Sequence, residues 1–297
     1  MMSDEGGLQR GSESGPAGGD DPLHGGRAVQ DEIERHTAEL EMLRRQFESL
    51  SSRLAEDLRL AGKVQRGLQP GPVHHPRLDL AREFIPFREV GGDYYDVVML
   101  GEERVALAIG DVMGKGIPAA LLAATLTATV RSQIQSGQSL PQDVVAHVNR
   151  LFWQVSPPGL FASLFYGVLD LRSGTLDYVN AGHHYPFVVR ARGGPDGVTQ
   201  LADGGTVLGL IEDAFFNRGR LRLGASDMLV LYSDGITDRT NPEGELYGIE
   251  RLEQAALFSR SDPARICLYS ILGDIQGWSR GSPAEDDATL IVARIRS

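Results

Sequence analysis

Aspartates stand beside several short apolar segments of this sequence. Asp93 lies in VGGDYYD, Asp111 follows RVALAIG, Asp234 follows MLVLYS, and Asp286 and Asp287 precede ATLIVARI. An aspartate at the end of a β-strand is held in register and projects its short side chain at the rim of the sheet. Carboxylates that converge there repel one another, so a cation is expected to neutralise them.

The residue types indicate which cation. Carboxylate oxygens without Cys or His ligands select Mg²⁺ or Mn²⁺ rather than zinc. Glycines beside the aspartates let the backbone approach a metal or a phosphate closely. Each aspartate alone also fits a turn, because Asp-Gly and Gly-Asp are common turn dipeptides. The set as a whole favours the metal site.

Five longer sequence motifs follow one another along the chain. They are FREVGGDYYDVVML, ALAIGDVMGKGIPAALLAATL, ASLFYGVLDLRSGTLDYVNAGHHYPF, GASDMLVLYSDGITDRTNPEGELYG and EDDATLIVARI. Together they resemble the SpoIIE-like branch of the PPM family of metal-dependent protein serine/threonine phosphatases. The resemblance covers about residues 60–297. It implies an α+β fold, a four-layer α/β/β/α sandwich of two antiparallel sheets flanked by helices.

The resemblance also implies a centre of two divalent cations, Mn²⁺ or Mg²⁺. Asp111 would bridge both ions, and the backbone carbonyl of Val112 would be a further ligand. Asp234 and Asp286 would complete one ion, and Asp93 would hold the other, partly through water. The family motif places the ligand first in the acidic pair, which favours Asp286 over Asp287.

Further residues take roles by the same resemblance. Asp238 matches a position that supports a third, loosely bound metal in some relatives. Arg88 has the spacing of a phosphate-docking arginine, with a surface arginine as the alternative. Two roles of Lys115 are equally consistent with the sequence: its side chain neutralises a phosphate, or it faces solvent. His183 and His184 match a structural hairpin feature rather than metal ligands.

The function implied is hydrolysis of phosphoserine or phosphothreonine by direct attack of a metal-bridging hydroxide. The expected substrate is a phosphorylated regulatory protein, an anti-sigma-factor antagonist of STAS type. No general acid is assigned, because Val-Met-Gly-Lys-Gly follows Asp111 where many eukaryotic relatives have histidine. Two alternatives are a catalytically silent coiled-coil regulator that binds a phosphoprotein, and a small-molecule phosphoesterase.

The chain is expected to have three parts: a disordered glycine-rich tail over 1–30, a linker helix over 31–70 and the phosphatase domain over 71–297. In the helix, apolar residues recur every 3.5 residues on average, interrupted only at His36 and Asp57. This spacing predicts a coiled coil that pairs two protomers through residues 31–68. The alternative is a helix on the domain's own surface. An upstream activator protein acting through the helix is a further expected partner.

Within the domain, the pattern predicts strands and helices in an α+β order. Strands are expected at 78–85, 94–100, 104–109, 161–169, 175–180, 185–190, 228–232 and 288–295, and helices at 116–135, 141–155, 249–258 and 263–278. Two consecutive helices between runs of hairpin-spaced strands argue against a doubly wound parallel sheet.

Composition excludes other classes of protein. The 297 residues include 29 Lys and Arg against 40 Asp and Glu, a net charge of −11 without a basic concentration, so nucleic-acid binding is not expected. The longest apolar run, 117–130, is shorter than the about 18–20 residues of a membrane span. The N-terminus lacks a signal-peptide core. The single cysteine, Cys267, fits a reducing compartment, and we expect a bacterial cytoplasmic protein.

Overall fold

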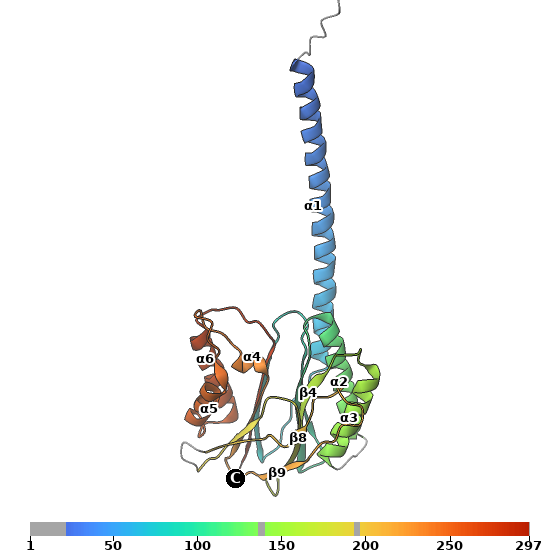
Figure 1. Ribbon diagram of the computed structural model, residues 1–297. Helices are drawn as coiled ribbons and strands as arrows, with labels where there is room; N and C mark the ends of the chain where they lie inside the picture. The colour runs from blue at the N-terminus through green and yellow to red at the C-terminus, as the bar shows by residue number, and fades with distance from the viewer. Residues whose placement is uncertain (1–21, 136–139, 193–196, 297) are drawn as a thin grey trace, which may run out of the picture. The chain divides into compact units, whose positions relative to one another are not determined.

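The computed structural model describes residues 22–135, 140–192 and 197–296. It divides into two units, one ending at Glu56 and one beginning at Asp57. The second unit contains two β-sheets that face one another with helices on their outer faces (Figure 1).

The first sheet has five strands, all antiparallel. In spatial order they are β1 (Leu78–Ile85), β11 (Ala288–Ile295), β10 (Met228–Tyr232), β6 (Phe187–Val189) and β7 (Val198–Gln200). The second sheet runs in the order β2 (Asp93–Met99), β3 (Arg104–Val112), β4 (Ala162–Asp170), β5 (Thr175–Ala181) and β8 (Gly204–Gly205). A further strand, β9 (Gly219–Arg222), pairs with β5. The pair β5–β8 is parallel, which departs from the expected purely antiparallel sheet.

Helices cover both outer faces. Helices α2 (Ile117–Gln135) and α3 (Pro141–Val155) pack on the second sheet, and α4 (Asp234–Thr237), α5 (Gly248–Phe258) and α6 (Ala264–Ser279) pack on the first (Figure 1). Buried Ala119, Ala123 and Leu126 recur at helical spacing on α2, and the small side chains allow close approach to the sheet. The predicted four-layer arrangement of two sheets and flanking helices is therefore confirmed.

The core between the two sheets consists of buried apolar side chains. Leu107 and Phe165 of the second sheet meet Leu231 and Ile291 of the first, and all four side chains are buried. Each sheet therefore has two apolar faces, which explains why its strands are apolar at consecutive positions rather than at alternate ones.

Some elements differ from the prediction. Strand β3 continues to Val112, so Asp111 lies within the strand ladder, paired with Asp93 on one side and Ser163 on the other. The short elements β7, β8, β9 and α4 were not predicted. They have two to four residues each, too few to show a period.

Helix α1 spans Pro22–Gly67. Residues 22–30 are therefore helical, and the prediction of disorder over 1–30 was wrong for that part. Once a helix is nucleated, each added residue gains a hydrogen bond, so strong helix formers downstream extend it over weaker ones. The rest of the predicted tail, 1–21, lies outside the described residues. The second unit begins at Asp57, earlier than the predicted boundary at 71, because the last turns of α1 contact the domain. No described helix is apolar over a length that would cross a bilayer.

Candidate metal centre

The strand arrangement brings the predicted aspartates to one edge of the sandwich. Asp93 at the start of β2 lies directly opposite Asp111 near the end of β3. Asp234 follows β10 and opens α4, and Asp286 precedes the neighbouring strand β11. Gly235 allows these two segments to meet, since a Cβ there would lie 1.9 Å from the carbonyl oxygen of Asp287.

Asp93 connects the two sheets through its carboxylate. Its Oδ2 accepts hydrogen bonds from Ser233 Oγ and from Thr289 Oγ1, each at 2.6 Å. Ser233 follows β10 and Thr289 belongs to β11, whereas Asp93 belongs to the other sheet. The contacts leave Oδ1 of the buried Asp93 as its remaining oxygen for a ligand. Sequence reasoning missed both hydroxyls, although Ser233 directly precedes a predicted ligand.

Asp287 is a second connection between the sheets. Its Oδ1 accepts from the backbone N–H of Phe87 at 2.8 Å, and its Oδ2 accepts from the N–H of Gly92 at 2.7 Å. A Cβ on Gly91 would lie 2.0 Å from Asp287 Oδ2, so the loop needs glycine there. Both carboxylate oxygens of this buried residue are therefore committed to backbone donors.

His183 forms a third connection. Its Nε2 lies 3.1 Å from the carbonyl oxygen of Tyr232, so this nitrogen carries the proton, and its Nδ1 accepts from Ser163 Oγ at 2.8 Å. Burial, with a smaller contribution from His184, lowers the pKa of His183 to about 3, so the ring is neutral. Both nitrogens are engaged. Ser163 pairs with Asp111, and Tyr232 stands two residues before Asp234.

The carboxylates at this edge repel one another. Burial and the charges of Asp234, Asp286 and Asp287 raise the pKa of Asp111 to about 7. Burial and the charge of Asp286 also raise the pKa of Asp234, and burial and the charge of Asp111 raise that of Asp93 well above its usual range. Such mutual repulsion is what a bound cation removes.

One cationic side chain contacts the acidic residues of the edge. The Lys115 ammonium lies 2.8 Å from Asp286 Oδ2 and donates to the carbonyl oxygen of Glu285 at 2.6 Å. Lys115, Asp234, Asp238 and Asp286 line a cavity of about 160 Å³. Asp238 is exposed there.

The donor set fits divalent cations in chemistry but is not preassembled. Within residues 22–135, 140–192 and 197–296, no three Asp, Glu, His or Cys side chains already stand together as a metal site. The oxygens nevertheless face one region. A Cβ on Gly92 would lie 3.0 Å from the carbonyl oxygen of Val112 and 3.1 Å from Asp111 Oδ1, so this glycine keeps both oxygens accessible. All these donors are the hard oxygens that Mg²⁺ and Mn²⁺ prefer.

Arg88 lies beside Phe87, whose backbone N–H contacts Asp287 and whose ring also lies near the Lys115 ammonium. Arg88 is exposed in the loop before β2, and its guanidinium carbon lies 5.2 Å from the centre of the Phe87 ring. The described contacts show no carboxylate bound to Arg88.

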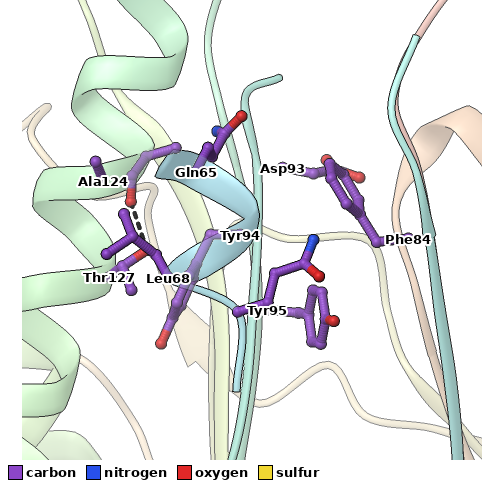
Figure 2. A pocket seen from close by; sticks show the side chains of 10 residues that line it. Gln65, Leu68, Phe84, Asp93, Tyr94, Tyr95, Ala124 and Thr127 are labelled. Carbon is purple, nitrogen blue, oxygen red and sulfur yellow. Dashed lines mark hydrogen bonds between the residues drawn. The ribbon is translucent and has the colours of Figure 1, made fainter. Parts of the chain in front are cut away.

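The end of α1 contacts the loop before Asp93. Gln65 Nε2 donates to the carbonyl oxygen of Gly91 at 2.7 Å, and the Gly91 N–H donates to Gln65 Oε1 at 3.0 Å. Beside this pair, residues of α1, β1, β2 and α2 line a cavity of about 30 Å³ (Figure 2). Gln65 of α1, Leu68 directly after α1 and Asp93 of β2 are among the residues that line it. The end of α1 therefore packs against the segment that carries Asp93.

Comparison with known proteins gives concordant matches. The family profile "Stage II sporulation protein E (SpoIIE)" matches residues 101–296. Protein IcfG of Synechocystis is 30% identical over 70% of this chain and 36% of its own length. Phosphoserine phosphatase RsbU of Bacillus subtilis is 28% identical over 82% of this chain and 72% of its own length. The chain thus spans about a third of IcfG.

A solved structure agrees with the fold. The RsbU and RsbW domains of Rv1364c from Mycobacterium tuberculosis superpose with a TM-score of 0.63 at 29% identity, over 75% of this chain and 61% of that one.

Proposed function

The chain belongs to the SpoIIE family, and from that premise we propose that it is a metal-dependent protein phosphatase. The observation that carries this function is the acidic edge, where Asp93, Asp111, Asp234 and Asp286 come from four segments and the pKa of Asp111 rises to about 7. Carboxylates whose pKa is raised by burial and by neighbouring carboxylates cluster at functional sites of proteins. Two divalent cations bound there would lower the pKa of a water and hold phosphoryl oxygens for in-line attack.

The chain's own residues have distinct roles in this proposal. Asp111 would contact both ions, and the backbone carbonyl of Val112 would be a further ligand. Asp234 and Asp286 would hold one ion, and the free Oδ1 of Asp93 the other. Asp238, in the adjoining cavity, would support a third, loosely bound ion. Arg88, exposed on the loop before β2, would contact the substrate's phosphate.

Asp286 is a better ligand candidate than Asp287. Both oxygens of Asp287 accept backbone N–H groups, whereas Asp286 Oδ2 contacts only the mobile end of a lysine side chain in the described contacts. A lysine ammonium can move away from an incoming cation far more readily than two backbone segments can. Asp287 then fixes the loops, and Asp286 faces the ion.

The proposed substrate is a phosphoserine or phosphothreonine of a small regulatory protein, of the STAS anti-sigma-factor-antagonist type. The similarity to RsbU, named a phosphoserine phosphatase, supports this class. A catalytically silent phosphoprotein binder would retain substrate affinity without turnover. A small-molecule phosphoesterase would prefer free phosphoesters over the phosphoprotein.

We further propose that α1 pairs two protomers and transmits a signal to the metal edge. Its apolar stripe is exposed: Phe47 is 73% and Leu50 68% accessible. Burying such a stripe against a second copy is the condition for a coiled coil. The Gln65–Gly91 hydrogen bonds would carry a change in helix packing to Asp93. Light scattering tests the pairing. The full chain should be a dimer, and a chain lacking residues 1–56 should be a monomer.

The catalytic proposal is tested by Mn²⁺-dependent phosphate release from phosphoserine peptides and from phosphorylated STAS proteins. Asp234→Asn should lose at least about 100-fold in rate, the scale of removing a charge-stabilising group. Asp143→Asn, an exposed carboxylate on α3, is the matched control and should retain activity. Equal rates in Asp234→Asn and wild type would refute the assignment.

A further inference from the structure

A cavity of about 700 Å³ lies at the end of the sandwich opposite to the acidic edge. The register fixes this position: β3 and β4 pair Asp111 with Ser163 at one end and Arg104 with Asp170 at the other. Its walls come from the chain before β1, the β4–β5 turn, the ends of β6 and β11, and the β9–β10 loop. Figure 1 shows β9 at this end of the molecule.

Arginine dominates the polar lining of this cavity. Five arginines line it, with one carboxylate, Asp227; the arginines are Arg77, Arg172, Arg190, Arg222 and Arg296. They are scattered over more than two hundred positions, which is why the sequence shows no basic run. In a chain of net charge −11, folding creates a local excess of positive charge.

The one lining carboxylate is already satisfied. Asp227 Oδ2 accepts from Arg190 Nη1 at 2.7 Å and from the Gly224 N–H at 2.9 Å, and its Oδ1 accepts from the Ala191 N–H at 2.9 Å. It is 6% exposed. Asp227 therefore fixes Arg190 and the neighbouring loops, and it offers little attraction to a cation from solution.

The other arginines keep donors available. Arg222 Nε donates to the carbonyl oxygen of Ser173, a neutral partner. Arg172 contacts Glu103 at 3.3 Å and Arg296 contacts Asp79 at 3.1 Å, and each guanidinium has five N–H groups. The Arg77 guanidinium has no hydrogen-bond or ion-pair partner in the described part of the chain. Asp79, Glu103 and Asp170 also contact these arginines, so within the described residues five arginines stand against four carboxylates, an excess of one.

We propose that this cavity binds a small molecule that carries two or more phosphate or carboxylate groups. Planar guanidinium groups bind such groups through paired hydrogen bonds, and separate arginines on several walls suit more than one anionic group. The volume lies within the range of about 300–1,000 Å³ that holds small ligands. Among the described lining residues none is aromatic, and these residues offer no stacking surface for a nucleobase.

The test is calorimetric titration of the full chain, free of metal, with methylenediphosphonate, which phosphatases do not hydrolyse. Binding with a Kd between about 10 μM and 1 mM is expected, and inorganic phosphate should bind at least about 10-fold more weakly, since it has one charged group to pair with the arginines instead of two. Arg77→Gln should weaken diphosphonate binding by about 10-fold or more. Arg150→Gln, an exposed arginine on α3, is the matched control and should leave it unchanged.

Other outcomes overturn the proposal. No heat up to about 10 mM diphosphonate, well beyond the affinity of any specific site of this charge, would show that the arginines do not form a site. Equal weakening by Arg150→Gln would show charge attraction only. Binding of an acidic peptide without binding of diphosphonate would make the cavity a protein-docking surface. Because Arg77 makes no described side-chain contact, its variant should melt at the wild-type temperature and hydrolyse aryl phosphate at the wild-type rate.

Discussion

Replacing Asp111 by asparagine should stabilise the metal-free protein while removing a ligand from the proposed metal site. The pKa of Asp111 is raised from 3.8 to about 7 by burial and by Asp234, Asp286 and Asp287. A carboxyl whose pKa is raised on folding destabilises the fold when ionised. That cost is absent below about pH 4, grows as the pH rises from about 4 to about 7, and is complete above.

The size of this effect follows from the pKa shift. A shift of about three units at about 1.4 kcal/mol per unit gives a cost of about 4 kcal/mol for ionised Asp111. Asparagine has nearly the same shape and no charge, and it can still accept the Val112 N–H. We therefore expect Asp111→Asn to gain about 1–4 kcal/mol at about pH 8, or a rise in Tm of about 3–12 °C for a domain of this size.

Thermal unfolding followed by circular dichroism, with chelator and then with Mn²⁺, measures the effect. The wild-type Tm without metal should fall between about pH 5 and pH 8, and the Asp111→Asn Tm should fall less. Added Mn²⁺ should raise the wild-type Tm more than that of the variant. Asp143→Asn should behave as wild type. If Asp111→Asn melts below wild type at about pH 8, the carboxylates do not repel as argued.

Substitutions at four other residues distinguish residues that fix the loops from residues that bind the ion. Asp287→Asn should lower the free energy of unfolding by about 1–3 kcal/mol, because two backbone N–H groups lose a charged acceptor. Asp286→Asn should change the free energy of unfolding by no more than about 0.5 kcal/mol and should weaken Mn²⁺ binding measured by calorimetry. The reverse pattern would exchange the roles of the two residues. Gly235→Ala should cost more than about 2 kcal/mol in chemical denaturation, since its Cβ would meet the Asp287 carbonyl oxygen at 1.9 Å. His183→Ala should weaken Mn²⁺ binding and lower stability, and His183→Gln should restore part of both; a loss of stability alone would limit His183 to a structural role.

The sequence predicts the parts of the site that depend on local pattern. Asp111 and Asp234 follow apolar segments long enough to be recognised as strands, and Asp286 precedes another. The pairing of Asp93 with Asp111 then needs only two adjacent antiparallel strands. These residues reach one edge in the structure as expected.

Contacts between the two sheets could not be predicted in this way. Ser233 and Thr289 reach Asp93 only because the sheets face one another, and the register across that interface has no sequence period. The same applies to His183, whose two partners come from different sheets. The five arginines of the opposite cavity are also distant in sequence, so only the fold reveals that they line one cavity.

Mn²⁺-dependent hydrolysis of a phosphoserine substrate by wild type, Asp111→Asn and Asp143→Asn tests the central claim most directly. Phosphate release should require Mn²⁺ or Mg²⁺, vanish with chelator, fall at least about 100-fold in Asp111→Asn and persist in the exposed control Asp143→Asn. Release that continues in chelator, or at the wild-type rate in Asp111→Asn, would contradict a metal-dependent phosphatase centred on this carboxylate.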